Sequence, residues 1–116
     1  MSKQKIYDMS FSKIFPLYVA KIERKGRTVL ELYSVIEWLT GYNEELLEEA
    51  IREEISLREF FDAAPNLNNK RSLVTGVICG VRVEEIKEDL MREIRYLDKV
   101  VDELAKGKKL SVILRQ

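Results

Sequence analysis

The chain of 116 residues contains no histidine. Histidine is the commonest general base at neutral pH, and the Ser-His and Cys-His nucleophile pairs and most zinc sites depend on it. Enzymes can use carboxylates, lysine or tyrosine instead, but the sequence shows no recognisable catalytic arrangement of those groups. Acidic clusters at residues 44–49 and 84–89 are interpreted as solvated faces, since the di-iron pattern needs Glu-x-x-His pairs. We therefore favour a non-enzymatic protein over an enzyme, and we expect no metal site and no cofactor.

A single cysteine, Cys79, excludes an intramolecular disulfide and fits a reducing compartment, so we expect a cytoplasmic protein. The basic residues near the N-terminus have no apolar core behind them, which is unlike a signal peptide. The most apolar stretch, Leu73–Val83, is interrupted by two glycines and an arginine. It is far shorter than the roughly 20 apolar residues that a membrane-spanning helix needs. We expect no membrane association.

Proline and glycine are scarce, at two and five residues, and no linker, repeat or low-complexity segment interrupts the chain. A chain of this length is close to the commonest size of one globular domain. It can bury roughly two-thirds of its unfolded surface, so it needs no disulfide or metal for stability. We expect residues 1–116 to form one compact domain.

Turn signals divide the first half of the chain into helices. Ser10 or Ser12 is a candidate N-cap for a helix that runs to about Lys25, with Pro16 in or near its first turn. The apolar residues at helical spacing predict its buried stripe: Ile14, Leu17, Tyr18 and Ile22. The motifs that open and close the next three helices are the capping boxes Thr28-Val-Leu-Glu31 and Ser56-Leu-Arg-Glu59, the cap Asn43, and the stops Gly41 and Pro65.

The strongest helical periodicity lies in the last third of the chain and ends at Gly107. It is carried by Ile86, Leu90, Ile94, Leu97, Val101 and Leu104. The preceding segment Leu73–Val83 is ambiguous, because its apolar spacing fits a helix while its β-branched residues suit a buried strand. No second alternating run offers a partner strand, so we favour a helix. The fold class predicted is an all-α domain of five or six helices.

The charges balance overall but are unevenly distributed. Residues 1–28 carry seven basic and two acidic side chains, whereas residues 31–62 carry two basic and ten acidic ones. Such blocks neutralise each other within a fold or across a subunit interface, or else the basic segments converge on one anion-binding face. Zero net charge and a pI near 6.4 argue against nucleic acid as a partner.

Two groups of residues near Leu73–Val83 are candidate functional residues. Gly76 and Gly80 have small-xxx-small spacing, and Cys79 extends the small surface, which indicates close helix packing or an interface. For Cys79 we favour a small buried residue over a reactive thiol. Arginines, hydroxyls and glycines also gather here and suggest a site for a small anion. Its candidate residues are Arg71, Ser72, Thr75 and Arg82, with Lys21 and Arg24 contributed by the first long helix.

Three phrases of the sequence resemble a family of short bacterial proteins, the domain of unknown function with number twenty-two hundred. They are KIYDMSFSKIFPLYVAKIERKGRT at residues 5–28, WLTGY at 38–42, and NKRSLVTGVICGVRVEEI followed by LMREIRYLDKVVDELAKGK. The resemblance covers almost the whole chain and implies a small stand-alone bacterial protein. It brings no catalytic residues to carry over.

Two functional hypotheses follow from these patterns. The first is a non-enzymatic interaction module that forms a homodimer, since opposite charge blocks can complement each other across a twofold axis. The alternative is a protein that binds a small molecule or anion around Arg71–Arg82.

Overall fold

The structure is a computed structural model, and it describes residues 3–116. Seven α-helices lie within these residues: α1 (Lys3–Asp8), α2 (Phe11–Glu23), α3 (Val29–Thr40), α4 (Glu44–Arg52), α5 (Leu57–Asp62), α6 (Asp89–Ala105) and α7 (Leu110–Ile113). The connection from α5 to α6 contains the 3-10 turns η1 (Asn69–Leu73) and η2 (Val83–Glu85), with the two-residue strands β1 (Val77–Ile78) and β2 (Val81–Arg82) between them. The predicted all-α class is confirmed.

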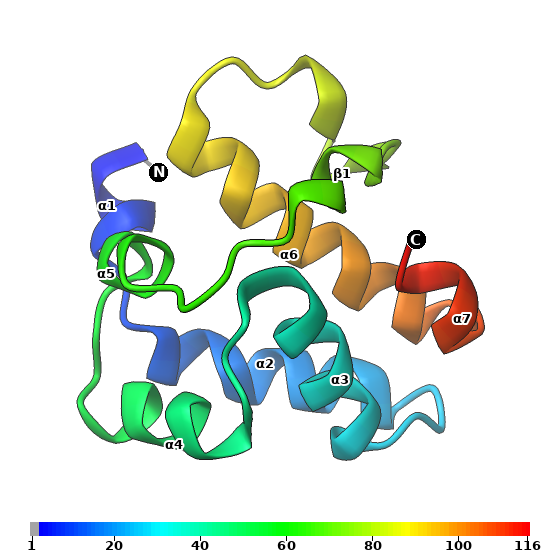
Figure 1. Cartoon of the computed structure of the whole chain (residues 1–116), viewed down its shortest axis with the longest axis horizontal. Coiled ribbons are helices and arrows are strands. Elements are labelled where there is room, and N and C mark those ends of the chain that lie inside the picture. The colour runs from blue at the N-terminus through cyan, green and yellow to red at the C-terminus, as the bar shows by residue number, and fades with distance from the viewer. Residues whose placement is uncertain (1–2) are drawn as a thin grey trace.

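Helix α6 is the central element of the fold. It crosses the middle of the molecule in Figure 1, and it packs against α2, α3, α5 and α7. Its inward face is fully buried at Leu97, Val101 and Leu104, as the helical periodicity predicted, and also at Val100. The helix begins at Asp89, three residues after Ile86, because residues 83–85 form the separate turn η2.

Helix α2 differs from its predicted form at Leu17. Pro16 is its sixth residue and lies just past the first turn, in or near which it was predicted. Tyr18 and Ile22 are buried as predicted, but Leu17 is 64% exposed, so its assignment to the buried stripe is wrong. The physical reason is that the helix carries apolar residues on two sides, and its neighbours α3, α4 and α6 cover only one of them.

Local capping signals place α3, α4 and α5 as the sequence predicted. Both capping boxes have their reciprocal bonds, and the Asn43 side chain accepts from the Leu46 backbone N–H. Gly41 ends α3 with a φ of 82°. A β-carbon at Gly41 would lie 2.6 Å from the Asn66 backbone nitrogen, so this position requires glycine on steric grounds as well.

The predicted helix over Leu73–Val83 is wrong, because this segment folds into a small antiparallel hairpin. Val77 pairs with Arg82 and Ile78 with Val81. The two residues of the turn, Cys79 and Gly80, have φ values of 51° and 79°. Positive φ at both central residues matches the right-handed twist of hairpin strands and is incompatible with an α-helix. The partner strand that the sequence analysis did not find is therefore β2, which lies in the same segment as β1.

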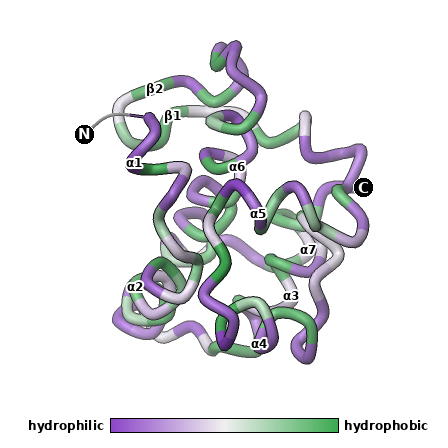
Figure 2. Tube along the Cα trace, turned by 90° about the vertical axis from the view of Figure 1, so that its left-hand side faces the viewer, coloured by the Kyte–Doolittle hydropathy of each residue, from purple (hydrophilic) through white to green (hydrophobic). Residues whose placement is uncertain are grey.

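The hairpin and α4 lie at opposite ends of the molecule. Figures 1 and 2, which differ by a turn about the vertical axis, both place the hairpin at the top and α4 at the bottom. Hydrophobic and hydrophilic residues are mixed along α2 and α4 in Figure 2, as expected of helices that have one face in the core and the other in solvent.

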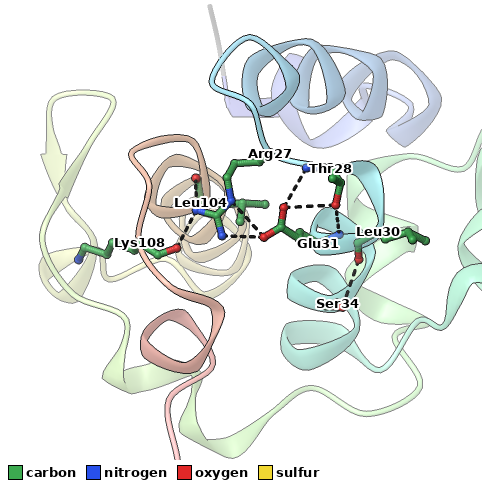
Figure 3. A network of polar contacts seen from close by, with 7 residues as sticks. All are labelled: Arg27, Thr28, Leu30, Glu31, Ser34, Leu104 and Lys108. Atoms are coloured by element: carbon green, nitrogen blue, oxygen red, sulfur yellow. Dashed lines mark hydrogen bonds and ion pairs between the residues drawn. The ribbon is translucent and has the colours of Figure 1, made fainter.

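A polar network ties the loop after α2 to the end of α6, as Figure 3 shows. Arg27 Nη1 donates to the backbone carbonyls of Leu104, at 3.1 Å, and Lys108, at 2.8 Å. Arg27 Nη2 bonds Glu31 at 2.8 Å, and Glu31 also closes the capping box of α3. One guanidinium therefore satisfies carbonyls at the C-terminal end of α6 while it orients the start of α3.

Candidate functional site

The residues of the predicted anion site are distributed over three separate depressions. Arg71 and Ser72 line a polar pocket between η1 and α6, whereas Arg82 lines a depression beside the hairpin. Lys21 and Arg24 lie between the C-terminal ends of α2 and α6. Thr75 is exposed on the segment between η1 and β1. The fold thus keeps Arg71 and Ser72 together and separates the others from them.

Arg71 fastens η1 to α6. Its Nε lies 2.9 Å from each oxygen of Glu93, and its Nη1 donates to the Asn68 backbone carbonyl at 2.9 Å. The side chains of Arg71 and Glu93 are 27% and 12% exposed, so this ion pair is partly shielded from solvent. The pocket beside it has a volume of about 230 Å³.

Sequence reasoning missed two residues of the Arg71 pocket, Arg92 and Tyr96, which join it from α6. Arg92 donates to the Ile86 backbone carbonyl at 2.9 Å and to Asp89 at 2.7 Å. The available signal was their spacing of four residues, which places Arg92 and Tyr96 on the same side of a helix. Sequence could not show that η1 folds back over that side.

The small residues of the predicted interface lie in or beside the hairpin. Gly76 packs against Lys99, where an added β-carbon would lie 3.1 Å from Lys99 Cε. Cys79 and Gly80 form the turn, and both are exposed. The expected burial of Cys79 is therefore wrong, because the residue occupies a turn and not a helix crossing. Its Sγ lies 3.4 Å from Nη1 of Arg95.

The depression at the ends of α2 and α6 is lined by basic side chains that surround one acidic residue, Asp102. Lys21 and Lys106 each lie 3.0 Å from an Asp102 carboxylate oxygen, while Arg24 and Lys25 complete the lining. Burial alone would raise the pKa of Asp102, but the hydrogen bonds from Lys106 and Lys21 outweigh it and hold that pKa below its usual value. Both helices end here, so these cations also complement the helix dipoles.

An apolar cleft lies between α1, α2, α5 and α6. Its volume is about 230 Å³, and its apolar walls are formed by Ile6, Met9, Ile14, Leu57 and Ile94. The exposed Leu17 stands at its rim.

Three polar side chains close one end of the apolar cleft. The Tyr18 hydroxyl donates to Asp98 Oδ1 at 2.6 Å, and Arg95 Nη1 donates to Asp98 Oδ2 at 2.8 Å. Burial raises the pKa of Tyr18 well above its usual value, and the neighbouring Asp98 carboxylate raises it further. The phenol is therefore protonated at neutral pH and acts as a fixed hydrogen-bond donor.

No group of three or more acidic, cysteine or histidine side chains within residues 3–116 is placed to hold a metal ion. No helix in the same range is both long and apolar enough to cross a membrane.

Residues 5–115 match the model of a family described as an uncharacterized protein conserved in bacteria, DUF2200. The chain belongs to the DUF2200 family. This confirms the resemblance seen in the three sequence phrases. No curated protein matches the DUF2200 chain.

The DUF2200 chain is similar to the crystal structure of the uncharacterized protein SP1917, with 44% sequence identity and a TM-score of 0.90. The similarity covers 98% of this chain and 93% of that chain. Neither description names an activity, a ligand or a partner, so a function for the DUF2200 chain has to be argued from its own geometry.

Proposed function

We propose that this DUF2200 protein is a non-enzymatic interaction module of the bacterial cytoplasm that forms a homodimer through the exposed side of α2. The observation that carries the proposal is that Leu17, 64% exposed, stands at the rim of an apolar cleft on the same face. An exposed leucine next to an apolar cleft is what a self-complementary surface requires, since each copy offers both parts.

A twofold axis beside Leu17 would let the leucine of each copy enter the cleft of the other. The surrounding side of α2 supports close approach, because Pro16 and Ala20 are also exposed there and are small or rigid. An apolar centre of this kind is typical of the buried core of a protein interface.

The size of the cleft favours a side chain over a free small molecule. Its volume of about 230 Å³ is below the roughly 300 Å³ at which pockets for small molecules usually begin. One leucine is an occupant of suitable size and chemistry. The hairpin residues Gly76, Cys79 and Gly80 would lie at the edge of this interface, because Arg95 joins Cys79 to the cleft.

The test is native mass spectrometry together with light scattering on the wild-type protein, Leu17→Asp and Leu30→Asp. Leu30 is a matched control, since it lies on α3 and is 66% exposed. We expect a wild-type dimer, a monomeric and folded Leu17→Asp, and a dimeric Leu30→Asp. A wild-type monomer at high concentration, or dimers of all three proteins, would contradict the proposal.

A further inference from the structure

The depression between the C-terminal ends of α2 and α6 holds more cations than its carboxylate can neutralise. Its lining residues within the described chain carry four positive charges, at Lys21, Arg24, Lys25 and Lys106, against one negative charge at Asp102, which is an excess of three. Lys21 Nζ lies 3.0 Å from Asp102 Oδ1, and Lys106 Nζ lies 3.0 Å from Asp102 Oδ2. Two ammonium groups therefore share a single counter-ion.

The other two cations, Arg24 and Lys25, have no counter-ion within residues 3–116. Both side chains are exposed, and neither makes an ion pair or a hydrogen bond to any residue in that range. Arg71, in the pocket between η1 and α6, differs in this respect because it is paired with Glu93. Like charges that are gathered in one depression repel each other, and a bound anion would relieve that repulsion.

The free cations are not needed to cap the two helices. At the end of α2, the carbonyls of Ala20 and Ile22 accept backbone N–H groups of the loop that follows. At the end of α6, the Leu104 carbonyl accepts from the Arg27 guanidinium at 3.1 Å. Because these terminal carbonyls already have donors, the basic side chains in the depression remain available for a ligand.

We propose that this depression binds a phosphate group of a small, multiply charged ligand. Arg24 and Lys25 contact the phosphate oxygens from the end of α2, and Lys106 contacts them from the end of α6. Asp102 is a positioning residue, since it holds the Lys21 and Lys106 ammonium groups on one side of the depression.

The size and the charge of the depression agree with a ligand of this class. Its volume of about 680 Å³ lies within the range of roughly 300–1,000 Å³ that is usual for small-molecule sites. An excess of three positive charges favours a diphosphate over an anion with a single charge. All of the lining residues belong to one chain, so binding does not require the proposed dimer.

The experiment is a titration of the isotope-labelled full chain with inorganic phosphate, pyrophosphate and ADP, each at neutral pH and at a constant ionic strength maintained with chloride. Backbone amide NMR shifts are followed at the ends of α2 and α6. The test protein carries Arg24→Gln and Lys25→Gln together. The control carries Lys13→Gln and Lys70→Gln, which remove the same net charge from exposed positions outside the depression.

We expect saturable shifts at the two helix ends, with pyrophosphate bound more tightly than phosphate. The affinity for pyrophosphate should fall about tenfold in the test protein and by less than about twofold in the control, because distant exposed charges are screened. The order of pyrophosphate and ADP identifies whether the phosphate group is free or carried on a larger molecule, and both orders support the site. The inference is overturned if pyrophosphate gives no saturable shifts, or if the control loses as much affinity as the test protein.

Discussion

The Tyr18 hydroxyl lies 2.6 Å from Asp98 Oδ1, which joins the buried side of α2 to α6 at the end of the apolar cleft. The second oxygen of Asp98 accepts from Arg95, so the carboxylate is held from both sides. These two hydrogen bonds fix the wall from which Leu17 projects. Their loss should therefore lower the free energy of unfolding and change the shape of the cleft.

Tyr18→Phe should lower the free energy of unfolding by about 1–3 kcal/mol, since it removes a hydrogen bond to a charged group in a buried setting. Chemical denaturation at neutral pH measures the effect. Tyr33→Phe is the control, because Tyr33 is only partly buried and its hydroxyl has no hydrogen bond among residues 3–116. Equal stabilities of the two variants would contradict the role assigned to Tyr18.

Raising the pH should destabilise the protein through its buried tyrosines. Burial first, and then Asp98, raises the pKa of Tyr18 above the unfolded value of 10, and burial raises the pKa of Tyr42 to about 12. Because these folded pKa values are raised, the stabilisation is complete below pH 10 and is lost as the pH rises through them. Unfolding free energies measured from pH 9 to 12 should decline, and Tyr18→Phe should decline less steeply.

Lowering the pH should destabilise the protein through Glu31. The hydrogen bond from Arg27, followed by that from the Thr28 backbone, lowers the pKa of Glu31 from 4.5 to about 2. Because this folded pKa is depressed, the contribution is present above pH 4.5 and is lost as the pH falls through about 2. Denaturation at several pH values should show a shallower acid dependence in Glu31→Gln. Glu37→Gln, on the exposed side of the same helix, should retain the wild-type slope.

Gly41→Ala should destabilise the fold by about 2 kcal/mol or more, since the left-handed φ is unfavourable and the new β-carbon meets Asn66. Gly107→Ala is the matched control. It has a φ of 89° with nothing within 4 Å of the added β-carbon, so only the conformational cost of about 1 kcal/mol applies. Thermal unfolding of both variants separates the steric contribution from the conformational one, and equal losses would contradict the close approach of Asn66.

Cys79→Gly should stabilise the protein by about 1 kcal/mol, because a non-glycine residue at a φ of 51° carries a conformational penalty. Cys79→Ser retains the β-carbon and should give no gain. Chemical denaturation under reducing conditions checks both variants. A loss of stability in Cys79→Gly would show that the contact between Cys79 Sγ and Arg95 outweighs the strain.

Local signals predicted the helices well, whereas long-range packing decided the features that sequence missed. The capping boxes at Thr28 and Ser56 need only four consecutive residues, so they could be identified without knowledge of the fold. The hairpin could not, because strands of two residues are too short to show alternation and its turn depends on φ values at Cys79 and Gly80. The spacing of the valines in Leu73–Val83 fits a helix, and for that reason the sequence analysis favoured a helix there.

The candidate sites depend even more on contacts between distant segments. Leu17 fits the apolar stripe of α2 by spacing, and only the positions of the neighbouring helices show that it faces solvent. Arg71 and Ser72 were identified from composition, but Arg92 and Tyr96 follow them by some twenty residues and meet them only because η1 folds over α6. No local rule predicts that contact.

The position of α6 within the chain has a consequence for biosynthesis. Helices α2, α3 and α5 all pack on a helix that begins at Asp89, so the surface through which each of them contacts α6 has no counterpart until residues 89–105 have been made. While it is still attached to the ribosome, the growing chain must carry those helices with their inner faces open to solvent or to a chaperone. Its collapse into the native state is therefore a late event that follows the emergence of α6.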